Sequence, residues 1–208
     1  AFTGGATGVP KGVMITHFNR ACCIRMGLPW IMKPLIKGIK GKSSVLLPVP
    51  LFHSYGRYMA QSAAHLGLRL ILMPDPRNIK LIVETIKEYR PFMICAVPTQ
   101  FMRIAQEKVG KINAITMSGA APLPKDVADS IKAELGNPVS EGYGLTETAP
   151  LTHFNISGFS KITGFMLKEK PGLGVPAPDT ECKIIDPDTG EEMAFGEPGE
   201  ILVRGPQI

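Results

Sequence analysis

Short apolar runs alternate with longer amphipathic segments along most of the chain. The apolar runs predict strands at 43–52, 68–73, 92–97, 113–119 and 139–144, of which 43–52 and 92–97 have the composition of buried strands. Apolar residues that recur on one side predict helices between these strands, at 55–66, after Asn78 as far as Tyr89, at 99–108 and at 124–135. Strands that alternate with helices are typical of a mostly parallel sheet with helices on its faces. The pattern therefore predicts an α/β fold.

Polar residues and prolines mark the ends of several segments. Thr16 is placed to cap a helix over 18–26, and Asn78 is placed to cap a later helix, because their side-chain oxygens can accept a hydrogen bond from the first turn. Pro48 and Pro50 must end the regular pairing of the first strand early, since proline has no N–H to donate.

The character of the chain changes at Gly172. The segments 180–186 and 199–205 are strand-like, and a turn-rich stretch separates them. This arrangement is typical of an antiparallel pair. We therefore expect an α/β region over 1–170 and a β-rich module over 171–208.

Charge and the scattered cysteines and histidines exclude several kinds of protein. The net charge of +5 is modest and does not indicate nucleic-acid binding. No C-x-x-C pair occurs among Cys22, Cys23, Cys95 and Cys182, which favours reduced thiols in a cytoplasmic protein. No metal-ligand spacing relates His17, His53, His65 and His153, so a zinc site is not expected. No apolar run approaches the roughly 20 residues that cross a bilayer, and no signal peptide opens the chain.

The first candidate for chemistry is TGGATGVPKG, from Thr3 to Gly12. Its glycines let backbone N–H groups approach an anion, Thr3 and Thr7 add hydroxyls, and Lys11 adds a positive charge. A plain turn and a phosphate-binding loop both fit this composition. No strand is expected before the loop, although such loops normally connect a strand to a helix.

Three further segments follow predicted strands. His53, in PLFHSYGRY, stands where the carboxyl edge of a sheet carries ligand-contacting groups, although a lone histidine is more often structural. SGAAPLPK has small residues, which permit either a flat ring or tight packing of the helix. In EGYGLTET, Tyr143 can stack on a purine, Thr146 can contact phosphate and Glu147 can hold Mg²⁺.

In this order, the segments TGGATGVPKG, PLFHSYG, SGAAPLPK, EGYGLTET and GEPGEILVRGPQ resemble the signature series of the adenylate-forming (AMP-binding) superfamily. That superfamily includes acyl-CoA synthetases, luciferases and peptide-synthetase adenylation domains. The resemblance implies that this chain is part of the large N-terminal domain of an acyl-CoA synthetase. The lysine-bearing C-terminal domain of such an enzyme would then lie beyond Ile208. It implies a two-step reaction with ATP, Mg²⁺ and CoA, in which an acyl-adenylate forms with release of pyrophosphate and a thioester forms afterwards. The isolated chain is expected to be inactive.

The resemblance also assigns roles to individual residues. The residues that match ATP- and AMP-binding positions are Thr3, Gly4, Gly5, Ala6, Thr7, Gly8, Lys11, Gly119, Ala120, Ala121, Glu141, Gly142, Tyr143, Gly144 and Thr146. Catalytic positions are matched by Lys11, His53, Thr146 and Glu147, and acyl-substrate positions by His53, Tyr55 and Met59. Glu147 matches a Mg²⁺ ligand, and Thr7 is a second candidate ligand. Gly4 and Ala6 depart from the commonest pattern, in which Ser or Thr is frequent.

Two segments bear on the identity of the acid substrate. FHSYG contains no aspartate to hold an ammonium group, which disfavours an amino acid. EGYGLTETAP followed by PGLGVPAPDTECKIID is most similar to long-chain fatty acid–CoA ligases. The alternatives are a medium-chain or aryl acid–CoA ligase and a non-catalytic nucleotide-binding module derived from such a ligase.

The expected partners are small molecules: a fatty acid, ATP and CoA. Four lysines, Lys33, Lys37, Lys40 and Lys42, form either a solvated loop or a basic surface for anionic lipid or the phosphates of CoA. The second alternative would allow peripheral contact with a membrane. A cut sheet edge would favour self-association, so a homodimer is also a candidate state.

Overall fold

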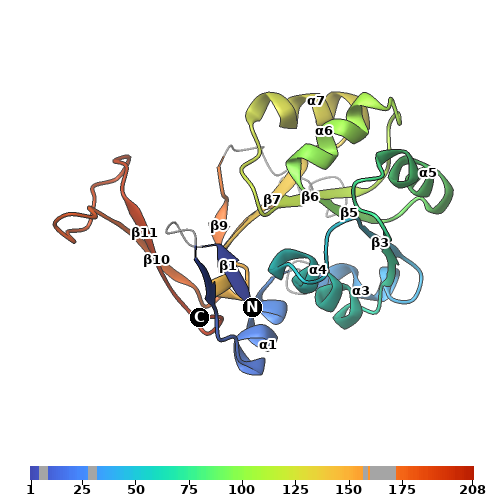
Figure 1. Ribbon diagram of the computed structural model, residues 1–208. Helices are drawn as coiled ribbons and strands as arrows, with labels where there is room; N and C mark the ends of the chain where they lie inside the picture. Colours follow the sequence, from blue (N-terminus) through green and yellow to red (C-terminus); the bar gives the residue numbers. More distant parts are fainter. Residues whose placement is uncertain (5–8, 28–31, 157–158, 160–171) are drawn as a thin grey trace.

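The computed structural model describes residues 1–4, 9–27, 32–156, 159 and 172–208. A seven-stranded sheet with the order β4-β3-β5-β6-β7-β8-β9 forms the body of the molecule (Figure 1). The strands from β4 to β7 pair in parallel, and β8 and β9 are added antiparallel at one edge. The predicted α/β fold with a mostly parallel sheet is confirmed.

The parallel strands lie within the predicted apolar runs but are shorter. The strands of the main sheet are β3 (Ser44–Leu47), β4 (Arg69–Leu72), β5 (Met93–Ala96), β6 (Ile115–Gly119), β7 (Val139–Tyr143), β8 (His153–Asn155) and β9 (Val175–Pro176). As expected, β3 ends at the residue before Pro48. The pattern did not predict β8 and β9, because two or three residues are too few to show a period of two.

Helices cover both faces of the sheet, and most of the longer ones connect its parallel strands. They are α1 (His17–Met26), α4 (Ser54–His65), α5 (Ile79–Tyr89), α6 (Pro98–Gln106) and α7 (Lys125–Leu135), with the short segments η1 (Lys33–Leu35), α3 (Ile36–Ile39) and η2 (Thr146–Thr148). Both predicted caps are confirmed: Thr16 accepts a hydrogen bond from the N–H of Asn19, and Asn78 accepts one from that of Leu81. The four lysines of residues 33–42 are exposed around η1 and α3.

Two apolar layers hold the helices on the sheet. Alternate residues of each strand face opposite sides, so Val45 and Leu47 belong to the layer with α1 and α4, and Leu46 to the layer with α5, α6 and α7. Phe101 and Ile82 are fully buried in the second layer. The carboxyl ends of the strands are thereby fixed relative to one another.

A glycine-rich hairpin precedes the first helix. β1 (Phe2–Gly4) pairs antiparallel with β2 (Pro10–Gly12). The expectation that no strand precedes the glycine-rich loop is therefore wrong, whereas the helix expected over 18–26 is confirmed as α1. Ala1 and Val13 exchange two backbone hydrogen bonds of 2.9 and 2.6 Å, which extend this pairing beyond the strands.

A second antiparallel pair, β10 (Glu181–Ile185) and β11 (Glu200–Arg204), projects from the body as an arm (Figure 1). It confirms the predicted C-terminal strand pair, although β9 within 171–208 joins the main sheet. The base of the arm is tied down by Gln207, whose amide donates to the Thr180 hydroxyl at 2.9 Å. Asn19 of α1 donates to the carbonyl of Ile208 at 2.9 Å.

The cysteines are free, as the sequence indicated. Burial raises the pKa of the Cys23 thiol to about 12, so this group is a poor nucleophile. In the described ranges, no helix combines the length and apolar character needed to span a membrane. The same residues hold no cluster of three or more His, Cys, Asp or Glu side chains that fits a metal ion.

Adjacent residues of α5 provide a test of this packing. Truncating Ile82, which is fully buried, to Ala should lower the free energy of unfolding by about 2–5 kcal/mol, because it leaves a cavity against the sheet. The matched change Leu81→Ala should cost less than about 1 kcal/mol, since Leu81 is 37% exposed. Urea titrations of both variants, followed by circular dichroism, measure the difference. Equal losses would contradict the assigned helix orientation.

Candidate functional site

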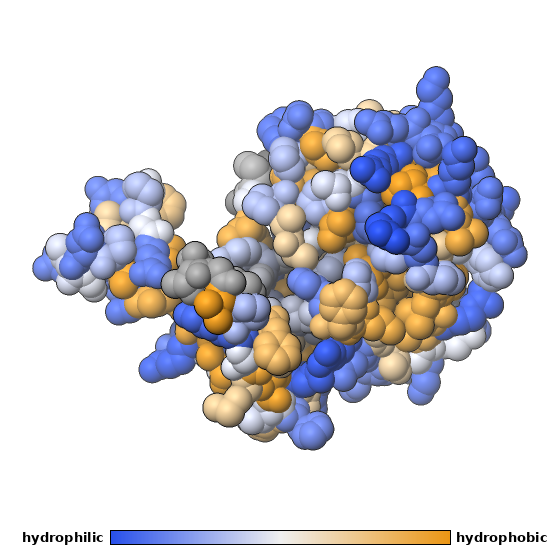
Figure 2. Space-filling view, viewed as in Figure 1, coloured by the Kyte–Doolittle hydropathy of each residue, from blue (hydrophilic) through white to orange (hydrophobic). Residues whose placement is uncertain are grey.

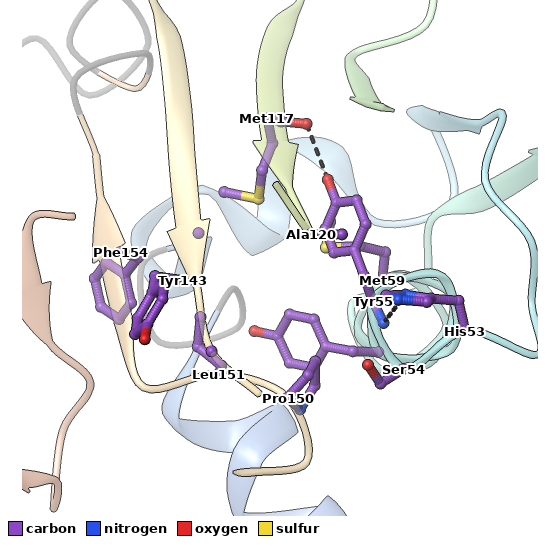
Figure 3. Close-up of a pocket in the computed structure, with 13 residues that line it drawn as sticks. His53, Ser54, Tyr55, Met59, Met117, Ala120, Tyr143, Pro150, Leu151 and Phe154 are labelled. Atoms are coloured by element: carbon purple, nitrogen blue, oxygen red, sulfur yellow. Dashed lines mark hydrogen bonds between the residues drawn. The ribbon is translucent and has the colours of Figure 1, made fainter. Parts of the chain in front are cut away.

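The ends of β6 and β7 and the start of α4 border one pocket (Figure 3). Its lining is mostly apolar and aromatic: Tyr55, Tyr58, Met59, Met117, Ala120, Tyr143, Pro150, Leu151 and Phe154, with His53, Ser54, Gly142 and Gly144. The pocket encloses about 540 Å³ of empty space, counting the part open to solvent. It lies at the carboxyl edge of the parallel strands, where α/β folds commonly bind ligands.

His53 has a structural role as well as a place at the pocket. It is the N-cap of α4, and its Nδ1 accepts a hydrogen bond from the N–H of Tyr55 at 3.2 Å. Because Nδ1 accepts this bond, the neutral imidazole carries its proton on Nε2. The side chain is exposed and can therefore offer an N–H donor to a ligand in the pocket.

Tyr55 forms a wall of the pocket. Its hydroxyl donates to the backbone carbonyl of Met117 at 2.9 Å, as drawn in Figure 3. Burial, more than the neighbouring Cys95 and Tyr58, raises the pKa of the Tyr55 hydroxyl well above its ordinary range. A Cβ at Gly119 would lie 3.0 Å from the Tyr55 ring, so glycine lets this ring lie close to β6. Tyr55 is therefore suited to shape the pocket and not to exchange protons.

The loop after β6 is held by Glu141. The N–H of Leu123 donates to Oε1 of Glu141 at 3.3 Å, which joins this loop to β7. Burial raises the pKa of the Glu141 carboxyl, and the hydrogen bond from Leu123 opposes that shift. Ala120 has a φ of +68°, a left-handed conformation that costs a non-glycine residue roughly 1–2 kcal/mol. The loop thus presents its backbone to the pocket in a strained but anchored form.

A compact turn follows β7. The Thr148 hydroxyl accepts from the N–H of Leu145 at 3.0 Å, and the N–H of Thr148 donates to the carbonyl of Leu145 at 3.0 Å. This turn contains η2, on which Thr146 is half-buried and Glu147 is exposed. The two residues are thereby held just beyond the strand that carries Tyr143.

The β1–β2 hairpin places two predicted residues together. Thr3 and Lys11 are directly opposite each other in the antiparallel pair, at the base of the glycine-rich loop, and Lys11 is exposed. The predicted phosphate-binding residues Gly5, Ala6, Thr7 and Gly8 lie outside the described residues.

The structure gathers only part of the predicted set in the pocket. Among the predicted residues, the lining contains His53, Tyr55, Met59, Ala120, Gly142, Tyr143 and Gly144. Described residues outside the lining are Thr3, Gly4, Lys11, Gly119, Ala121, Glu141, Thr146 and Glu147. The nucleotide and catalytic roles of all these residues stay predictions.

Several lining residues were not predicted from the sequence. They are Ser54, Tyr58, Met117, Pro150, Leu151 and Phe154. Met117 could have been found, because it lies two residues before Gly119, a predicted site residue. Alternation along β6 puts these two positions on one face of the sheet. Leu151 and Phe154 could not, because the unpredicted strand β8 brings them back to the pocket.

The two glycines that flank Tyr143 allow a matched test of this geometry. A Cβ at Gly144 would lie 1.6 Å from the Pro150 carbonyl oxygen, whereas the nearest atom to a Cβ at Gly142 is 3.9 Å away. Gly144→Ala should therefore destabilise the protein by about 1–3 kcal/mol, and Gly142→Ala should leave the packing unstrained. Thermal unfolding of both variants measures the difference. A stable Gly144→Ala protein would show that the turn is not closed as described.

Known proteins match this chain over its whole length. The chain is 36% identical over 217 residues to the long-chain-fatty-acid–CoA ligase of Bacillus subtilis (strain 168), covering 100% of this chain and 36% of that protein. It is 31% identical over 214 residues to 4-coumarate–CoA ligase 1 of Arabidopsis thaliana, covering 100% of this chain and 37% of that protein. The chain thus spans little more than a third of the curated relatives it matches.

Solved structures share the fold. The O-succinylbenzoate coenzyme A synthetase of Bacillus subtilis, in complex with ATP and magnesium ion, superposes with a TM-score of 0.79 at 26% identity, covering 100% of this chain and 41% of that one. The family model described as AMP-binding enzyme matches residues 1–208. Family model, sequence and fold therefore agree over the whole of this chain, and the chain belongs to the AMP-binding enzyme family.

Proposed function

We propose that the protein containing this chain activates a carboxylic acid with ATP and then transfers the acyl group to CoA. The proposed acid is a long-chain fatty acid. The observation that carries the proposal is the position of His53 and Tyr143 on one apolar pocket, with Thr146 and Glu147 held on the turn after Tyr143. This arrangement pairs a place for an apolar acid with groups suited to a nucleotide.

In the first proposed step, a carboxylate oxygen attacks the α-phosphorus of ATP and pyrophosphate leaves. His53 is suited to orient the carboxylate, because its Nε2–H can donate to an oxygen while Nδ1 is held by Tyr55. Lys11 and the Thr146 hydroxyl are suited to the phosphates, where a positive charge and a hydroxyl offset developing negative charge. In the second step, the CoA sulfur attacks the acyl carbon, the bond to AMP breaks, and a thioester forms.

The donor set near the turn fits Mg²⁺. Glu147 offers an exposed carboxylate on η2. In the described part of the chain, no cluster of three or more acidic, cysteine or histidine side chains could hold a metal ion by itself, so the ligands of Mg²⁺ would have to include groups of the substrate. Mg²⁺ commonly binds through one or two carboxylates together with substrate phosphates, so Glu147 would hold it against ATP. When bound, the ion supplies charge neutralisation for the departing pyrophosphate.

The lining of the pocket favours an acid with an apolar body. The described residues that line the pocket include no Asp or Glu, so the lining offers no carboxylate for an ammonium group. Apolar surface also gathers around α4 in Figure 2. Leu51 and Phe52, which precede that helix, are 42% and 82% exposed. A fatty acid and a hydrophobic aryl acid both fit this chemistry, and the similarity to long-chain-fatty-acid–CoA ligases favours the former.

A panel of acids tests the proposed substrate. In the full-length protein, pyrophosphate exchange into ATP should be strongest with long straight-chain acids, because each further methylene buried in the pocket adds about 0.8 kcal/mol of binding. The panel should include C6 to C18 fatty acids, 4-coumarate and amino acids. If exchange is strongest with 4-coumarate, the substrate is an aryl acid and not a fatty acid. If no acid supports exchange, the proposed adenylation is wrong.

Removing one charge tests the role of Glu147. Glu147→Gln should lower the exchange rate by about 100-fold or more. Loss of one group that stabilises charge in the transition state typically lowers a rate by about this factor. Glu191→Gln, an exposed change near the β10–β11 arm, is the matched control and should leave the rate unchanged. Excess Mg²⁺ should partly restore the first variant and have no effect on the second. A normal rate for Glu147→Gln would remove this residue from the site.

A further inference from the structure

His153 lies beside Tyr143, the predicted adenine-stacking residue, on the neighbouring strand. Tyr143 on β7 and His153 on β8 are paired in the antiparallel register, so their side chains share one face of the sheet. The two ring centroids are 6.2 Å apart with the planes tilted by 57°. His153 is only 5% exposed, whereas Tyr143 is half-buried. The histidine therefore limits the positions open to the tyrosine ring.

Thr152 joins both residues through hydrogen bonds. Its backbone N–H and its hydroxyl both donate to the carbonyl of Tyr143, at 2.9 and 3.2 Å. The same hydroxyl oxygen lies 3.0 Å from Nδ1 of His153. Because a hydroxyl has a single proton and Thr152 gives it to Tyr143, the second contact needs a proton on Nδ1 of His153. The order of donation is then imidazole to threonine to the Tyr143 carbonyl.

The surroundings keep this chain of bonds intact at neutral pH. Burial lowers the pKa of the His153 imidazole below its ordinary range, which keeps the ring neutral. Thr152 is 1% exposed, so water does not compete freely for its hydroxyl. Buried, connected hydrogen bonds of this kind favour a single geometry.

We infer that Thr152 and His153 are positioning residues for nucleotide binding, which hold the Tyr143 ring and the Tyr143–Gly144 peptide in the orientation that adenine stacks on. The inference rests on the proposed function, since it needs a purine at Tyr143. Neither residue lines the pocket, so neither is expected to contact the nucleotide. Their contribution is pre-organisation: without them, ATP must order the tyrosine on binding, which weakens its affinity.

Changes at Thr152 separate this role from simple packing. In the full-length protein, Thr152→Val keeps the shape and the backbone N–H but removes the hydroxyl, and should weaken ATP binding roughly 3- to 10-fold. Thr152→Ser keeps the hydroxyl and should restore wild-type affinity. Inorganic pyrophosphate has no adenine, so its affinity should be the same in all three proteins. Calorimetric titrations with ATP and with pyrophosphate measure both quantities.

Two further variants keep the test decisive if Thr152→Val folds poorly. His153→Asn retains a donor near the position of Nδ1 and should bind ATP better than His153→Phe, which retains a ring but no donor. In a Tyr143→Leu background, which has no ring to position, the His153 changes should cost nothing more, as expected for coupled residues.

The outcomes are distinct. Equal ATP affinity for wild type and Thr152→Val, equal losses for ATP and pyrophosphate, or full additivity with Tyr143→Leu would each overturn the positioning role and leave the proposed function intact. Failure of the wild-type protein to bind ATP would overturn both.

Discussion

The hydrogen bond from the Tyr55 hydroxyl to the Met117 carbonyl is the contact on which the pocket depends. It joins α4 to β6 through a buried side chain, and the Tyr55 ring lies against Gly119 at the end of that strand. His53 caps the same helix, so its position follows from that of Tyr55. Leu123 then ties the loop after β6 to Glu141 on β7. One helix end and two strand ends are thus held as a unit around the pocket.

Observed structural roles and predicted functional roles coincide in two residues of this unit. His53 caps a helix with one nitrogen and leaves the other for a ligand. Glu141 matches the nucleotide-binding series, yet its carboxylate holds the neighbouring loop. A histidine or an acid near a pocket therefore need not be either structural or functional, because its two polar atoms can serve both purposes.

The parallel part of the fold was predictable, since long apolar runs such as 92–97 and capping residues such as Asn78 are local signals. The strands β1, β2, β8 and β9 were not, because each has only two or three residues and is stabilised by partners distant in sequence. The same limit applies to the site. Motif residues such as Tyr143 were found by resemblance, whereas Leu151 and His153 reach the site through the pairing of β8 with β7.

A crystal structure of the full-length protein with ATP and Mg²⁺ would show whether the carboxyl edge of this sheet binds the nucleotide. Adenine is expected between the Ala120–Ala121 backbone and the Tyr143 ring, with the phosphates directed toward Thr146 and the β1–β2 hairpin. Nucleotide bound elsewhere, with the pocket of Figure 3 and the Tyr143 ring uncontacted, would contradict it.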